Sequence, residues 1–574
     1  MAIFHITTAT SRFVSGAGQN AFGPPSFPSD DTPNADTLIV DPAAYLVSVN
    51  SNAAELAATG AWTVTVNGVI ASLNEVGINL AAGNAAASTI HIGIDGGVQG
   101  GTGGIVLQSA ANIDNGGTIV AASGGVAILI ANTGPNTITN SGEISASSGV
   151  GIKATVTSND TVHNSGTIDG INLSAGDDTV TNTGLAGFVR LGDGNNHLSN
   201  SGRLGSVSAG SGDDTVTNSG DVSGVALGEG ANHFTNSGRL EDGNPDLSSY
   251  SGGSGDDTVT NTGKIEAAVR LGDGDNTLTN SGAIAGGILG GLFGGSGNDK
   301  LINSGTIGDL SNLANVQLGD GNNTLINSGK IFGAVSGGSG ADTVTDFAIV
   351  GDVMQSGTIP ATISLGDGND TFNGGDRTEF VQDGNGADTY NLGGGNDFYT
   401  ATGNTGSDGN DLVRGGTGID GYDAQAATSA CQINLDSVPH GLLGPNTAVG
   451  ADIAGSAKDA IFGFENVFSG SGNDVIYGSG SGNRLFGDDG DDFLFGFGGN
   501  DTLDGGGRKR SARRRRGQGQ PDRRRRGGHL FFTRRCQTAA SPPARATSSP
   551  ISIQGRATRS ISLPSMPTQR MGQE

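Results

Sequence analysis

Acidic residues recur every nine positions near the C-terminal end of the chain, each two positions before an apolar residue. In residues 469–507 this series is Asp474, Asn483, Asp492 and Asp501. The apolar residues that follow are Ile476, Leu485, Leu494 and Leu503. Carboxylate, amide and backbone carbonyl oxygens are the ligands that Ca²⁺ prefers. Glycine-rich turns before each acid let the backbone curl inward, so the spacing predicts a row of oxygen-ligated cation sites.

A second block with the same period lies at residues 365–400. Its acidic positions are Asp370, Glu379, Asp388 and Asp397, and after a short break Asp411 and Asp420 continue them. We expect residues 18 positions apart to pair, namely Asp370 with Asp388, Glu379 with Asp397, Asp474 with Asp492, and Asn483 with Asp501. The last pair is predicted to be the weakest, because Asn483 carries no charge and the pair would lie at an uncapped end.

The nine-residue period also predicts the elements that position these residues. Nine residues hold one short strand and one tight turn, so two nonapeptides form one 18-residue coil of a flattened solenoid. Stacked strands lie about 4.8 Å apart, and Ca²⁺ takes oxygen ligands at about 2.3–2.6 Å. An ion therefore fits between carboxylates of successive coils. The apolar residues two positions later, including Phe372, Val381, Tyr390 and Tyr399, are predicted to point inward.

The run of nonapeptides resembles the G-G-x-G-x-D-x-U-x repeat of the RTX (hemolysin-type) calcium-binding family. Residues 418–478, which contain FGFENVFSGSGND, resemble the segment that links nonapeptide blocks in the C-terminal β-roll of serralysin-like proteases. The resemblance implies a parallel β-roll, Ca²⁺ as cofactor, and type I secretion with an uncleaved C-terminal signal. The chain has no H-E-x-x-H sequence, so the zinc protease that often accompanies this roll is not expected.

A different repeat, T-[VIL]-x-N-[ST]-G, occupies residues 136–346. Its asparagines are Asn140, Asn164, Asn182, Asn200, Asn218, Asn236, Asn261, Asn280, Asn303 and Asn327. Stacked asparagines can form hydrogen bonds along a solenoid. The turns between them place an acid or an asparagine at the ligand position, as at Asp178, Asn196, Asp214 and Asn232. Some of these turns could hold Ca²⁺, and the sequence leaves this question open.

Composition limits the classes of protein that fit. The 574 residues contain 104 glycines, one tryptophan, two cysteines and a net charge of −26. Residues 508–574 hold 17 Lys and Arg against two acids, so the preceding 507 residues carry a net charge of −41. Such an acidic body suits cations and disfavours nucleic acid and anionic membranes as partners. No apolar run is long enough to span a membrane, and no Sec-type signal peptide is recognised.

We predict an all-β chain, built as a parallel β-solenoid or β-roll of 18-residue coils with insertions. The expected parts are a disordered leader (1–35), an N-terminal β region or cap (36–135), the asparagine-repeat solenoid (136–346), a nonapeptide roll (347–423), a linking insert (424–468), the calcium-binding roll (469–507) and an Arg-rich disordered tail (508–574). The leader is inferred from its prolines among Ser, Gly and Asp.

The Arg-rich tail admits three interpretations. A basic run is normally a solvated tail, and nuclear targeting or nucleic-acid binding are more specific options. The third interpretation is a frameshift, because glycine codons read out of frame encode arginine. In that case the C-terminal export signal would be lost and export would be impaired.

The predicted function is that of a secreted, calcium-binding repeat protein with a structural, adhesive or matrix role, which folds when it meets Ca²⁺ outside the cell. Cell-surface or matrix polysaccharide is a candidate partner. No nucleotide-binding P-loop sequence occurs, and G-T-G-I-D-G at residues 416–421 lacks the amphipathic helix of a dinucleotide site. The alternative is an extracellular polysaccharide lyase or epimerase on a β-solenoid, with the repeats as an aid to export and folding.

Overall fold

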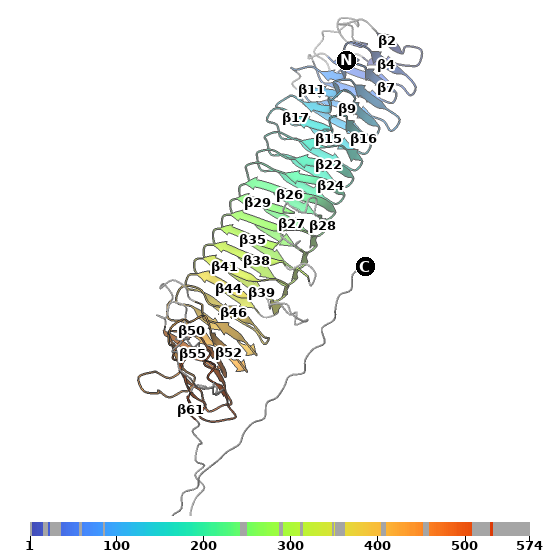
Figure 1. Cartoon of the computed structure of the whole chain (residues 1–574). Helices are drawn as coiled ribbons and strands as arrows, with labels where there is room; N and C mark the ends of the chain where they lie inside the picture. Colours follow the sequence, from blue (N-terminus) through green and yellow to red (C-terminus); the bar gives the residue numbers. More distant parts are fainter. Residues whose placement is uncertain are drawn as a thin grey trace, which may run out of the picture. The chain divides into compact units, whose positions relative to one another are not determined.

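The structure, a computed structural model, is all-β in the residues that it describes. These are 3–14, 21–22, 36–56, 60–83, 86–241, 249–285, 291–309, 314–346, 349–350, 362–402, 409–451, 458–507 and 529–531. Their strands form two long sheets, and successive coils stack in chain order (Figure 1). Among the described residues no helix is long and apolar enough to cross a membrane. The predicted solenoid of parallel strands is therefore confirmed.

The first sheet holds one strand from nearly every coil. Its strands are β1 (Ile3–Ile6), β3 (Asp36–Val40), β6 (Trp62–Val66), β9 (Ser88–Ile92), β12 (Ala111–Asn115), β15 (Thr137–Asn140), β18 (Thr161–Asn164), β21 (Thr179–Asn182), β23 (His197–Asn200), β25 (Thr215–Asn218), β27 (His233–Asn236), β30 (Thr258–Asn261), β33 (Thr277–Asn280), β36 (Lys300–Asn303), β39 (Thr324–Asn327), β42 (Thr343–Asp346), β45 (Thr371–Asn373), β47 (Thr389–Asn391), β50 (Leu412–Arg414), β53 (Gln432–Asn434), β54 (Thr447–Val449), β55 (Lys458–Phe462), β57 (Val475–Tyr477), β59 (Phe493–Phe495) and β61 (His529–Phe531).

The second sheet covers the other side of the coils. Its strands are β2 (Arg12–Val14), β4 (Tyr45–Ser48), β5 (Ala54–Leu56), β7 (Val69–Ser72), β8 (Val76–Leu80), β10 (Gly97–Gly100), β11 (Gly103–Leu107), β13 (Thr118–Ala121), β14 (Val126–Ile130), β16 (Glu143–Ala146), β17 (Ile152–Ala154), β19 (Thr167–Ile168), β20 (Ile171–Asn172), β22 (Leu185–Arg190), β24 (Arg203–Ser208), β26 (Asp221–Glu229), β28 (Arg239–Leu240), β29 (Tyr250–Ser254), β31 (Lys264–Ile265), β32 (Val269–Asp273), β34 (Ala283–Ile284), β35 (Gly291–Ser296), β37 (Thr306–Ile307), β38 (Asn315–Asp320), β40 (Lys330–Ile331), β41 (Val335–Ser339), β43 (Ile349–Val350), β44 (Ile363–Asp367), β46 (Phe380–Gln382), β49 (Phe398–Thr400), β52 (Gly421–Ala424), β56 (Asn466–Ser469), β58 (Arg484–Phe486) and β60 (Thr502–Asp504). A two-stranded pair, β48 (Gly394–Gly395) with β51 (Thr417–Gly418), lies apart from both sheets.

Strand register follows the sequence periods. Val180 of β21 pairs with Leu198 of β23, and Phe372 of β45 pairs with Tyr390 of β47, each 18 residues on. In strands such as β25 the second and fourth residues are buried, and the first and third, both threonines, are more accessible. This is the alternation expected of a strand with one face on a core. The predicted inward residues Phe372, Val381, Tyr390, Tyr399, Ile476, Leu485 and Leu494 are all buried. Leu503 is only partly buried against the same core.

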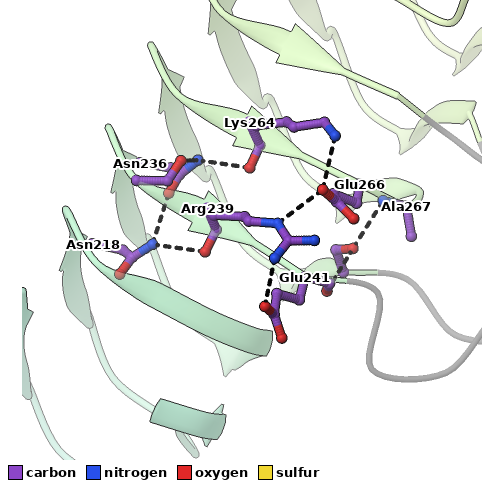
Figure 2. A network of polar contacts seen from close by, with 9 residues as sticks. Asn218, Asn236, Arg239, Glu241, Lys264, Glu266 and Ala267 are labelled. Atoms are coloured by element: carbon purple, nitrogen blue, oxygen red, sulfur yellow. Dashed lines mark hydrogen bonds and ion pairs between the residues drawn. The ribbon is translucent and has the colours of Figure 1, made fainter. Parts of the chain in front are cut away.

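The recurrent asparagines form a continuous ladder. Each Nδ2 donates to the Oδ1 of the equivalent residue in the next coil, at 2.7–2.9 Å, from Asn115 to Asp346. Figure 2 shows one stretch, in which Asn218 donates to Asn236 and to the backbone oxygen of Arg239. These side chains are buried, so the ladder satisfies polar groups that would otherwise be costly inside the core. The predicted structural role of the recurrent asparagine is confirmed.

The N-terminal residues that we assigned to a disordered leader contain two strands. β1 pairs with β3 in parallel, and β2 pairs with β4. The rings of Phe4, Phe22 and Trp62 pack together, with centroids 5.1–6.2 Å apart. Phe22 and Trp62 are buried and Phe4 packs against the core, and this packing was not visible in the proline-rich composition of residues 1–35. The leader interpretation is therefore wrong for residues 3–14 and 21–22.

The insert at 424–468 carries the first sheet across a break in the repeats. β50 pairs in parallel with β55, β54 pairs antiparallel with both β55 and β53, and β53 pairs in parallel with β57. One reversed strand is thus inserted into an otherwise parallel sheet. Of the Arg-rich tail, only residues 529–531 are described, and as β61 they pair with β59. The predictions for residues 508–528 and 532–574 lie outside the described residues.

Candidate metal-binding rows

Acidic residues in the turns form two rows along the solenoid. The first row consists of the residue immediately before most first-sheet strands, and the second row of the residue immediately before each second-sheet strand from β46 onward. At most steps of both rows a carboxylate or amide oxygen accepts a hydrogen bond from the backbone N–H of the equivalent residue in the preceding coil; Asn483, whose Oδ1 accepts from the N–H of Ser479, is an exception. Because a turn residue just before a strand cannot complete the ladder of that strand, the side chain of the next coil satisfies its N–H.

All four predicted pairs are brought together. The backbone N–H of Asp370 donates to Asp388 Oδ1 at 2.7 Å, and that of Asp474 donates to Asp492 Oδ1 at 2.9 Å. The corresponding distances are also 2.9 Å from Glu379 to Asp397 and from Asn483 to Asp501. Asp411 and Asp420 continue the rows, accepting from the N–H groups of Asp388 and Asp397 at 2.8 Å. All ten predicted site residues therefore lie in the rows.

The rows differ in burial at their end. Nine of the ten predicted residues are buried, whereas Asp501 is partly exposed. Nδ2 of Asn483 donates to the backbone oxygen of Glu465, and its Oδ1 accepts from the N–H of Ser479, so the oxygen that would be a ligand already has a partner in its own turn. The position expected to be weakest is also the most open to water.

One oxygen of most row carboxylates has no protein partner. Oδ2 of Asp370, Asp397, Asp420, Asp474 and Asp492, and Oε2 of Glu379, are buried without a hydrogen bond in the part of the chain that the structure describes. Buried polar atoms are almost always satisfied, and a series of exceptions calls for an ion or ordered water. A hard divalent cation is a fitting partner, since the available atoms are carboxylate and backbone carbonyl oxygens.

Burial raises the pKa of several row carboxyls, among them Asp370, Glu379 and Asp492. The pKa of Asp370 rises to about 7, first through burial and then through the neighbouring charges of Asp388 and Asp342. The pKa of Asp492 rises to about 6 for the same primary reason, with Asp474 adding to it. Burial also raises the pKa of Glu379, and its contact with Asp397 raises it further. These groups favour a proton or a cation over an isolated negative charge.

The turn glycines leave room for these carboxylates. A Cβ on Gly415 would meet the Asp420 carboxylate, and a Cβ on Gly487 would meet that of Asp492. Each of these glycines lies five residues before its acid, so the first glycine of the nonapeptide forms a cradle for the ligand. Gly418, two residues before Asp420, has φ +149°, and a Cβ at this position would meet the backbone oxygen of Gly395. Residues with side chains are therefore disfavoured there.

The densest group of acids lies inside the coils at β46–β55. Oxygens of Asp383, Asp388 and Asp411 all lie within 4.8 Å of one another and could hold one metal ion. Tyr390 donates to Asp388 at 3.0 Å, and Tyr399 lies 3.4 Å from Asp411. Burial, together with the charges of Asp383 and Asp459, strongly raises the pKa of Asp411.

Sequence reasoning missed Asp383, Asp459 and Glu465. Asp383 occupies the first glycine position of its nonapeptide, where no ligand was expected. Asp459 and Glu465 lie in the insert, yet they continue the two rows, since Asp459 accepts from the N–H of Asp411 and Glu465 from that of Asp420. Asp459 precedes the buried Ile461 by two positions. That spacing was the available signal for its place in the row.

The G-x-G-x-x-G sequence at 416–421 belongs to these turns. It leads into strand β52, with Asp420 in the second row, and therefore does not open a helix. The comparisons with known proteins add no relative to this geometry: no family model matches the chain, and no curated protein matches it.

Proposed function

We propose that this chain is a calcium-ion-binding repeat protein that folds fully only when Ca²⁺ is present, and that it has a structural or adhesive role outside the cell. The observation that carries the proposal is the series of stacked, buried carboxylates, six of which have one unsatisfied oxygen: Asp370, Glu379, Asp397, Asp420, Asp474 and Asp492. Stacked acids of one sign repel in the absence of a counter-ion. Extracellular Ca²⁺ supplies that counter-ion.

The residues that would hold the ions are those of the two rows. They are Asp370, Glu379, Asp388, Asp397, Asp411, Asp420, Asp474, Asp492 and, at the more open end, Asn483 and Asp501. The ion would supply the positive charge that these stacked carboxylates need. Ca²⁺ in extracellular modules binds with a Kd of about 10⁻⁴–10⁻³ M, so millimolar Ca²⁺ stabilises the folded state by mass action.

Location and partner follow from the same reasoning. A protein whose folding needs millimolar Ca²⁺ gains stability outside the cell, and the resemblance to RTX repeats agrees with export. Long stacked sheets with rows of outward-facing threonine, as in β21 and β25, offer an extended surface to a matrix or cell-surface polysaccharide.

The test is folding of the full chain stripped of divalent ions. We expect far-UV circular dichroism and thermal melting to show a cooperative gain of β structure as Ca²⁺ is added, with millimolar midpoints. Mg²⁺ is the matched control, because its demand for octahedral geometry and its retained waters fit these turns poorly. Identical spectra and melting curves in EGTA and in Ca²⁺ would contradict the proposal.

Within the described residues, the surface hollow beside Asp376 gives the polysaccharide-modifying alternative no support. The surface hollow lined by Gly374, Gly375, Asp376, Arg377 and Gly393 offers one carboxylate. A lyase or epimerase requires acid and base groups on both sides of a sugar. Assay of uronate polymers for cleavage or epimerisation discriminates between the two functions.

A further inference from the structure

The first row changes its composition along the chain. Between β23 and β42 asparagine and aspartate alternate, in the order Asn196, Asp214, Asn232, Asp257, Asn276, Asp299, Asn323 and Asp342. From Asp342 onward the row is acidic at each step, through Asp370, Asp388, Asp411 and Asp459. The stacking geometry is the same in both parts, with backbone N–H to side-chain oxygen distances of 2.7–3.2 Å.

The asparagine amide makes contacts that a bound cation would make. Asn196 Nδ2 donates to the turn carbonyls of Gly192 and Gly194, at 3.2 and 3.0 Å, and to Asp214 Oδ1 at 2.8 Å. The –NH₂ group therefore sits between two backbone carbonyls of its own turn and a carboxylate of the next coil. Its positive end meets three oxygen atoms, as a hard cation in that place would.

The same arrangement recurs at the other asparagines of the alternating part. Asn276 Nδ2 donates to the carbonyls of Gly272 and Gly274 at 3.1 and 2.9 Å. Asn323 Nδ2 donates to those of Gly319 and Gly321 at 3.0 and 3.1 Å. An aspartate in this position has no N–H to donate. The turn carbonyls and the carboxylate of the next coil then need a partner from outside the chain.

The amide also acts on the acid of the next coil. Asp214, Asp257, Asp299 and Asp342 each accept a hydrogen bond from an asparagine amide. Burial raises the pKa of each of these carboxyls to about 6, and the hydrogen bonds from asparagine offset part of that rise.

Spacing of the charges adds to the effect. In the alternating part, aspartates are two coils apart, so their carboxylates are about 10 Å from one another. Oδ2 of Asp214, Asp257, Asp299 and Asp342 also lacks a partner in the described chain, so burial of each of these acids still costs some folding free energy. In the acidic part neighbouring carboxylates are one coil apart, and their mutual repulsion adds to that cost.

We infer that the asparagine side-chain amide takes the place of a bound cation in the turns of residues 190–346, so that this part of the solenoid folds without Ca²⁺. The requirement for a cation begins at Asp342, where the first row becomes continuously acidic. The asparagine ladder ends at Asp346, in the same coil. The inference rests on the proposed function for residues 362–507, and it divides residues 190–507 into a cation-independent part (190–346) and a cation-dependent part (362–507).

Hydrogen–deuterium exchange of the full chain, resolved by peptide, tests this division in EGTA and in Ca²⁺. We expect strands β23–β39 to keep their protection in EGTA and strands β45–β59 to lose about tenfold or more of theirs. Loss of protection in both parts on chelation overturns the inference and leaves the proposed function intact. If protection changes in neither part, the proposed function is overturned, and the division into two parts is overturned with it.

Asn196→Asp should make the alternating part require a cation for folding. It makes the first row acidic at every step from Asp178 to Asp214, while keeping the oxygen that accepts from the N–H of Asp178. We expect exchange in β21–β25 to become about tenfold faster in EGTA and to recover in Ca²⁺. Asn195→Asp is the matched control: it adds the same charge one residue away, at an exposed turn position where the neighbouring coils carry Asp177 and Asp213. It should be indifferent to Ca²⁺.

The converse variant covers the case in which Asn196→Asp fails to fold. Asp370→Asn places an amide in the acidic part, where Oδ2 of Asp370 has no partner in the described chain, and it keeps the oxygen that accepts from the N–H of Asp342. We expect it to raise the protection of β45–β47 in EGTA relative to the parent. If Asn196→Asp exchanges like the parent in EGTA, or stays unprotected in Ca²⁺, the amide does not stand in for a cation. If Asp370→Asn leaves protection in EGTA unchanged, the same conclusion holds.

Discussion

In the turns before the first sheet, residues 196–342 alternate asparagine with aspartate, whereas residues 370–459 present aspartate alone. Both parts use the same strand register and the same backbone N–H to side-chain oxygen bond. They differ in what meets the turn carbonyls and the carboxylate of the next coil. In the alternating part the chain supplies the N–H groups of a neutral amide, and in the acidic part we propose that a cation from solution takes that place. Two stretches of one fold can thus have opposite dependence on their medium.

The surface supplies a second contrast. Glu266 meets Arg239 at 2.8 Å and Lys264 at 2.8 Å (Figure 2), and these partners lower its pKa to about 2. For the row carboxyls Asp370 and Asp492, burial is the leading influence and raises the pKa instead. The direction of the pKa shift therefore separates a surface carboxylate that is paired with cationic side chains from carboxylates that are buried without one.

The largest expected effect is that of pH on the acidic part without Ca²⁺. A raised pKa means that the folded state binds more protons, so stability is greatest near pH 4 and falls as pH rises through about 6–7, the folded pKa values of Asp492 and Asp370. The shift of Asp492, from 3.8 to about 6, corresponds to at most about 3 kcal/mol. In EGTA we expect β45–β59 to melt at a higher temperature at pH 5 than at pH 7.5. In Ca²⁺ the difference should shrink or reverse, because protons compete with the ion; an EGTA melting temperature that rises with pH would contradict this.

Removal of one rung of the asparagine ladder should destabilise the alternating part in a way that Ca²⁺ does not repair. Asn218→Ala leaves the amide of Asn200 without its acceptor and Oδ1 of Asn236 without its donor. We expect a loss of about 2–3 kcal/mol, measured by urea unfolding monitored at β23–β27. Thr217→Ala, on the outer face of the same strand, is the control and should cost much less. If Ca²⁺ restored the stability of Asn218→Ala, this would contradict the division between the two parts.

A smaller effect is expected from Asp492→Asn, which removes one charge from the acidic part. Asn retains the oxygen that accepts from the N–H of Asp474, so the fold is kept. In EGTA the variant should be more stable by about 1 kcal/mol, because a buried charge is gone. Isothermal titration calorimetry should show fewer Ca²⁺ bound than in the parent. Asp504→Asn, which changes an exposed acid, should alter neither quantity.

The smallest effect is that of Glu266→Gln. Its two partners lie at the surface, and such pairs contribute about 0.5 kcal/mol. Because the pKa of Glu266 is lowered, this contribution is present above about pH 4.5 and is lost as pH falls toward 2. Urea unfolding at pH 7 with and without Ca²⁺ should give the same small loss. A loss that depends on Ca²⁺ would link this network to the acidic rows.

Several features of the fold and site could be predicted because they repeat. The nine-residue period identified the inward residues and the stacked pairs, since side chains one coil apart in sequence must face each other across neighbouring strands. The recurrent asparagine was predicted to form a ladder by the same reasoning. Features without a repeat were missed: the aromatic packing of Phe4, Phe22 and Trp62, the reversed strand β54, and the acids Asp383, Asp459 and Glu465. Each depends on contacts between segments whose spacing in sequence is irregular.

The sequence by itself determined the all-β class, the coil period and which turn residues stack, because these follow from strand alternation and constant spacing. Only the tertiary structure decided what fills each turn. Whether an asparagine points its amide at two carbonyls and a carboxylate, or turns away as Asn483 does, depends on the coil stacked against it. The alternation of Asn196 with Asp214 could be seen in the sequence. The contacts of the asparagine amide with two turn carbonyls and a carboxylate could be seen only in the stacked coils.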